Sequence, residues 1–188
     1  QCLVGSEMCI RDSTYTVLRL KSAMNRGGTI ENIYMTRVSA ENVRQVLAAD
    51  LNWNPSYSYS TLPKEYEGKE IPEHWKVMLT PVEPPEKGYP RFRDIYLSQV
   101  KAENVDEFIS ASGWNDTLRL ENFYLYGIKA QTNKPGKICY TRNFNLSEIT
   151  LDVKDKDAIV LKENEQSNIH FDYVKTTTDR RTAGNLPH

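Results

Sequence analysis

The chain has 188 residues, and its 24 lysines and arginines nearly balance its 25 aspartates and glutamates. This balance gives no bulk field that attracts nucleic acid or an anionic membrane, so neither is expected as a partner. No apolar run reaches the roughly 18 residues of a transmembrane helix. The three cysteines, Cys2, Cys9 and Cys139, are too few and too scattered for a disulfide framework or a metal cluster, so no cofactor is expected.

Residues 1–13, QCLVGSEMCIRDS, look like the conceptual translation of a transposase-type sequencing adapter. A signal peptide is the alternative, but the segment has no basic start, and Glu7, Arg11 and Asp12 interrupt its apolar residues. We therefore expect residues 1–13 to be an adapter-derived artefact. The native sequence is then expected to begin upstream, which places residue 14 inside a domain.

The next segment, YTVLRLKSAMNRGG at residues 15–28, starts with an alternating pattern. In a strand, Leu18 and Leu20 point to one face, and Arg19 and Lys21 point to the other. If the leucines fill the interior, the two cations stand together on the outer wall. Arginine can bind a carboxylate through two hydrogen bonds and lysine acts as a point charge, so the pair suits an acidic ligand. Arg-x-Lys is also common on ordinary solvated surfaces.

Three segments further along align without gaps, at residues 29–43, 91–105 and 119–133, and residues 145–158 follow more loosely. Within each, apolar residues such as Ile33 and Met35 alternate with polar or tyrosyl neighbours, which is the period of a strand. Equivalent polar residues, Asn32, Asp94, Asn122 and Glu148, give intervals of 62, 28 and 26 residues. The last two intervals suit one coil of a parallel β-helix, in which each coil buries its inward residues against the previous coil, and the first interval is too long by about one coil or more. An amphipathic helix over residues 39–47 is the alternative.

The excess length of the first interval lies in residues 54–90, which are rich in Pro, Tyr and charge and show no sustained period. We expect a long ordered loop inserted between coils, with a short strand at residues 75–79. Residues 176–188 are polar and unpatterned, which predicts a flexible tail. The expected architecture is an all-β parallel β-helix over residues 14–175, with an insertion at 54–90.

The string RLKSAMNRGGTIENI at residues 19–33 resembles the Arg-Ile-Lys motif of glycoside hydrolase family 28, the polygalacturonases. The matching residues are Arg19, Lys21, Gly27, Gly28, Ile30, Asn32 and Ile33. The resemblance implies a right-handed parallel β-helix and inverting hydrolysis of galacturonan, with Arg19 and Lys21 binding the substrate carboxylate. Trp53 lies near the place where that family has a tyrosine, so it is a third candidate for substrate binding. Its alternative role is to anchor the inserted loop. The resemblance also implies an extracellular or periplasmic protein that is monomeric at full length, with a pectic polysaccharide as its partner.

The catalytic motifs of that family are not found in this chain. It has no Asp-Asp pair, and none of its three histidines, His74, His170 and His188, is flanked by glycine. We expect His170 to be an outward strand residue. The chain is therefore expected to hold substrate without cleaving it, as the C-terminal part of a hydrolase. A non-catalytic β-helix for carbohydrate binding or structure is the alternative, and a pectate lyase would need a cluster of acidic calcium ligands that is not seen.

Overall fold

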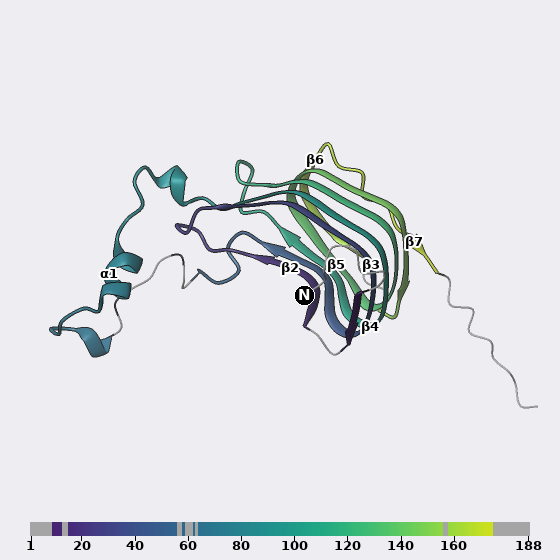
Figure 1. Cartoon of the computed structure of the whole chain (residues 1–188). Helices are drawn as coiled ribbons and strands as arrows, with labels where there is room; N and C mark the ends of the chain where they lie inside the picture. Colours follow the sequence, from purple (N-terminus) through teal and green to yellow (C-terminus); the bar gives the residue numbers. More distant parts are fainter. Residues whose placement is uncertain are drawn as a thin grey trace, which may run out of the picture.

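The computed structural model describes residues 15–55, 58, 62, 64–155 and 158–174, together with the backbone of residues 9–12. Its main body is one seven-stranded sheet in which every pairing is parallel, with the order β1-β3-β4-β5-β6, while β2 also pairs with β3 and β7 with β5. Figure 1 shows the long strands as curved ribbons nested in one another. The predicted all-β, parallel architecture is confirmed. The strands are β1 (Cys9–Asp12), β2 (Thr16–Lys21), β3 (Thr29–Asp50), β4 (Arg91–Ser112), β5 (Leu120–Val153), β6 (Val160–Glu165) and β7 (Asp172–Tyr173).

The first three repeats lie in the predicted register. Ile33 of β3 pairs with Ile95 of β4, and Ile95 pairs with Phe123 of β5, so the intervals of 62 and 28 residues are confirmed. Residues 39–47 belong to β3, so the helical alternative for this segment is wrong. Ile95 and Phe123 are fully buried, as are most of their apolar equivalents, and together they form one continuous core. Burial of each large apolar side chain contributes roughly 1.5–3 kcal/mol to stability.

Bends shape the long strands. Asn32, Arg37 and Asn42 have left-handed backbone with φ of 56°, 56° and 55°, so β3 turns every five residues. Asp94, Gln99 and Asn104 repeat this spacing in β4. Asparagine and aspartate tolerate left-handed backbone better than most residues, which explains their place at the first bend. Asn122 Nδ2 donates to Asp94 Oδ1 at 2.7 Å, so the side chains at this bend join one layer of the stack to the next.

The predicted register of the fourth repeat is wrong by five residues. Asn143 Nδ2 donates to Asn122 Oδ1 at 2.8 Å, and the Phe144 ring stacks on Phe123 with centroids 5.1 Å apart. Asn143, rather than Glu148, is therefore equivalent to Asn122, and the two halves of β5 lie side by side as successive layers 21 residues apart. Glu148 occupies the second bend of its layer, with φ of 54°. Because bends recur every five residues, the sequence pattern also fits when it is shifted by five residues, from Asn143 to Glu148.

The inserted segment after β3 contains the 3-10 helices η2 (Lys64–Tyr66) and η3 (Pro85–Gly88) and the α-helix α1 (Glu73–Leu79). The strand predicted at residues 75–79 is therefore wrong. Pro72 precedes the helix, where its fixed φ is tolerated, and Lys76 forms an ion pair with Glu73 at 2.6 Å. No residue of α1 is buried, and Figure 1 shows it standing away from the strands. Local interactions thus decided its conformation.

Both ends predicted to be unusual fall largely outside the described residues. The tail predicted at 176–188 lies wholly outside them. Of the segment predicted to be an adapter artefact, the structure describes the backbone of Cys9–Asp12, which pairs with β3 as β1. His170 is exposed as predicted, but it precedes β7 rather than lying within a strand, and its Nε2 is 3.3 Å from Asp172 Oδ1.

Candidate cation and aromatic site

Strand β2 holds two cations on its outer face. Leu18 and Leu20 are buried, with 8% and 6% of their surface exposed, while Arg19 and Lys21 are exposed. The predicted alternation is therefore confirmed for this strand. Strand β3 lies next to β2 in the following layer, where Arg19 pairs with Ala48 and Lys21 with Asp50.

Trp53 lies directly against these two cations. The chain turns after β3, and the Trp53 N–H donates to the Ser22 carbonyl at 3.1 Å, which fixes the turn beside the end of β2. Lys21 Nζ lies 4.3 Å from the centroid of the Trp53 ring, and Arg19 Cζ lies 5.6 Å from it. Both distances are within the range of cation–π attraction. The structure therefore brings together all three residues singled out in the sequence.

Two further residues extend this arrangement and were missed in the sequence. Arg19 Cζ lies 5.2 Å from the centroid of the Tyr15 ring, and Arg44 Cζ lies 4.9 Å from the same centroid. The Arg44 N–H donates to the Tyr15 carbonyl at 3.1 Å, which holds the two residues together. Cations and rings thus alternate in a row, here called the cation–aromatic row: Arg44, Tyr15, Arg19, Trp53 and Lys21.

The row borders a cavity of about 220 Å³. Arg19 is in register with Ala48 of β3, and Ala48 with Ser110 of β4. These two small side chains leave space beside the long arginine, and both line the cavity. The remaining lining residues are Leu20, Gln45, Ala49 and Asp50, together with the members of the row.

The charge of the site is unbalanced. Arg19, Lys21 and Arg44 form no ion pair with any residue that the structure describes. Asp50 supplies the one carboxylate among the lining residues, and its Oδ1 accepts a hydrogen bond from the Asn52 N–H at 2.8 Å. Three cations against one anion leave a local excess of positive charge. The described part of the chain contains no cluster of His, Cys, Asp and Glu that could hold a metal ion.

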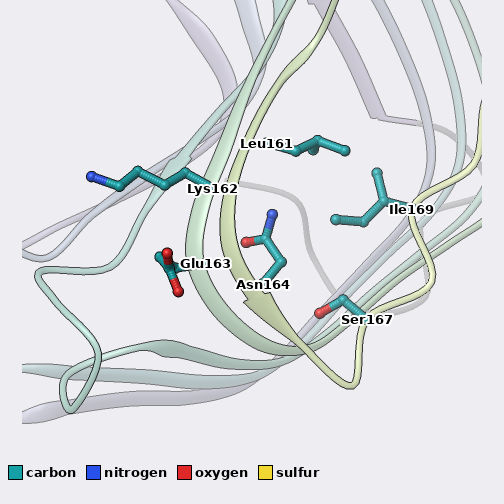
Figure 2. A pocket seen from close by; sticks show the side chains of 6 residues that line it. All are labelled: Leu161, Lys162, Glu163, Asn164, Ser167 and Ile169. Carbon is teal, nitrogen blue, oxygen red and sulfur yellow. The ribbon is translucent and has the colours of Figure 1, made fainter.

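A second hollow of about 340 Å³ lies along β6, and Figure 2 shows its side chains. Its polar groups bond to the chain itself: Asn164 Nδ2 donates to the Ile138 carbonyl at 2.9 Å, and Asn164 Oδ1 accepts from Thr141 Oγ1 at 2.8 Å. It therefore offers a ligand fewer free polar groups than the cation–aromatic row. Its lining residues are Leu161, Lys162, Glu163, Asn164, Ser167 and Ile169.

No family model, curated protein or solved structure matches this chain. Among the described residues, no helix is both long and apolar enough to span a membrane. Function is therefore inferred from the site.

Proposed function

We propose that this protein binds an acidic pectic polysaccharide, galacturonan, through the cation–aromatic row. One observation carries the proposal: three cations without an ion-pair partner in the described chain are held against two aromatic rings around an open cavity. Cations are normally paired or fully hydrated, and two aligned on neighbouring positions of one strand repel each other. An anion from outside the chain relieves that repulsion.

The chemistry of the row fits a uronic acid. The Arg19 guanidinium can bind a carboxylate through two hydrogen bonds, and Lys21 adds a compact charge beside it. Trp53 has 37% of its surface exposed, so part of it is open to the face of a sugar ring. Ser110 and Gln45 add polar groups at the cavity that can meet hydroxyls. A small inorganic anion would interact with the cations but would not contact the aromatic rings.

We propose further that the scaffold is a right-handed parallel β-helix. In-register parallel layers, left-handed bends every five residues and a single continuous core support this fold. Such a scaffold repeats each outward position in the next layer, which is how β2 and β3 place Tyr15 beside Arg44.

The resemblance of residues 19–33 to the polygalacturonase motif supports assignment to an extracellular or periplasmic pectin hydrolase of that type. Inverting hydrolysis needs two carboxyl groups around the scissile bond, and the cavity has one, on Asp50. The same observation favours the second candidate, a non-catalytic β-helix that binds carbohydrate. Under both, the 188-residue chain should release no reducing ends from polygalacturonate, and release by this chain would contradict the role assigned to the row.

The test is a binding titration of the 188-residue chain with polygalacturonate and with fully methyl-esterified pectin, which has the same backbone without the charge. We expect binding to the acidic polymer alone, weakening as salt rises. Arg19→Gln and Lys21→Gln should each weaken it about tenfold, the loss of one charge-assisted hydrogen bond.

Arg37→Gln is the matched control. Arg37 is an exposed cation of β3 at a bend, and Gln99 occupies the same bend of β4 with φ of 53°, so glutamine fits there. It should leave binding unchanged. Equal affinity for both polymers, or equal loss in the control, would overturn the proposal.

A further inference from the structure

Arg44 and Tyr15 form one end of the row, next to Arg19. Arg44 stands in β3 four residues before Ala48, the partner of Arg19, and four residues correspond to about 13 Å along an extended strand. Arg44 is bonded to Tyr15 through its backbone, so it shares that end. The backbones of Arg44 and Arg19 are therefore apart, while both guanidinium groups approach the same ring.

Arg44 is also available to a ligand. It is exposed, and it forms no ion pair with any described residue. The acidic residues of β4 nearest in register bond elsewhere. Glu107 Oε2 accepts from Gln45 Nε2 at 2.5 Å, and Asp106 Oδ1 accepts from Asn133 Nδ2 at 3.5 Å.

The Tyr15 ring contacts both Arg44 and Arg19. Its ring lies about equally far from the two guanidinium groups, at 4.9 and 5.2 Å, and 52% of its surface is exposed. An aromatic face fixes a cation without neutralising it, so both guanidinium groups keep their charge and their hydrogen-bond donors. Arg44 can therefore offer its charge to an anion beside the one held by Arg19 and Lys21.

We infer that Arg44, supported by Tyr15, forms a second anion-binding position, so that the row selects a chain with acidic groups on separate sugars over a single uronic acid. This inference rests on the proposed function. It also predicts that the bound chain lies along β2, between the Tyr15 end and the Trp53 end.

The test is an NMR titration of the folded 188-residue chain with galacturonate and with trigalacturonate. The unmodified chain should bind the trimer at least tenfold more tightly than the monomer. Arg44→Gln should weaken trimer binding about tenfold and leave monomer binding within about twofold. Tyr15→Leu should also weaken trimer binding, but with less selectivity, since its ring contacts both Arg44 and Arg19. Arg37→Gln should change neither.

The outcomes separate this inference from the proposed function. If the unmodified chain binds neither ligand, both are overturned. If it binds both and Arg44→Gln changes neither affinity, the second position is wrong and the proposed function stands. If Arg44→Gln weakens monomer and trimer equally, Arg44 belongs to the first position, and the selection for a chain is wrong.

Discussion

Replacement of Asn122 tests the bends that shape the stack. Its backbone is left-handed, with φ of 57°, and its amide group bonds both neighbouring layers, to Asp94 at 2.7 Å and to Asn143 at 2.8 Å. Alanine removes both bonds, at about 0.5–1.5 kcal/mol each. It also pays roughly 1–2 kcal/mol for left-handed backbone. We expect Asn122→Ala to lower the free energy of unfolding by about 2–5 kcal/mol.

Asn122→Gly separates the two contributions. Glycine loses the same hydrogen bonds but adopts positive φ freely. The Asn122→Gly variant should therefore be more stable than the Asn122→Ala variant by up to about 1 kcal/mol. In an ordinary strand the order is reversed, because glycine weakens strands. Lys129, an exposed residue of β5 outside the bends, is the control: there alanine should be the more stable. Urea denaturation followed by circular dichroism measures all four variants. Equal or greater stability of Asn122→Ala over Asn122→Gly would refute a left-handed bend at this residue.

Two further predictions concern close packing and ionisation. Gly136 has φ of 95°, and a Cβ there would collide with the Ile109 carbonyl, whereas Gly68 has open space around it. The free energy of unfolding, measured by urea denaturation, should therefore fall by at least about 2 kcal/mol more in Gly136→Ala than in Gly68→Ala. Burial between neighbouring tyrosines raises the pKa of Tyr96. The unfolded phenol ionises first, near pH 10, so the folded chain binds more protons above that pH and loses stability as pH rises. Between pH 9 and 11, the Tyr96→Phe variant should lose less stability than the unmodified chain. An equal loss in both would contradict the raised pKa of Tyr96.

The strands could be predicted where one physical rule acted alone. Burial on one face imposes a period of two, and stacking imposes equal spacing, so Ile33, Ile95 and Phe123 were placed in register correctly. The fourth layer was misplaced because the bends impose a second spacing of five residues. Asn143 and Glu148 then fit the pattern equally well by composition. The side-chain bond between Asn143 and Asn122 and the stacking of Phe144 on Phe123 distinguish them.

The site was predictable in part, for a related reason. Alternation along a single strand was enough to place Arg19 and Lys21 on the outer face. Tyr15 and Arg44 meet only through the pairing of β2 with β3, at an interval of 29 residues. The residues of β2 do not resemble the later repeats, so this interval was not visible in the pattern. A search for residues 28 or 29 positions apart would have found the pair.

Two arginines elsewhere in the stack contrast with the unpaired cations of the row. At two other positions on the outer face, a neighbouring layer supplies an acid to an arginine: Arg93 meets Glu31 at 2.6 Å, and Arg142 meets Glu121 at 3.0 Å and Glu165 at 3.2 Å. This pairing also favours correct register, because opposite charges face each other across strands.

The layers next to Arg19 could also supply an acid, but they place Ala48 and Ser110 beside it. An acid at either position would neutralise the arginine and fill the cavity. The stack instead keeps the charge, orients it with two aromatic rings and leaves space in front of it. Each part of that combination would serve the proposed site for an acidic sugar chain.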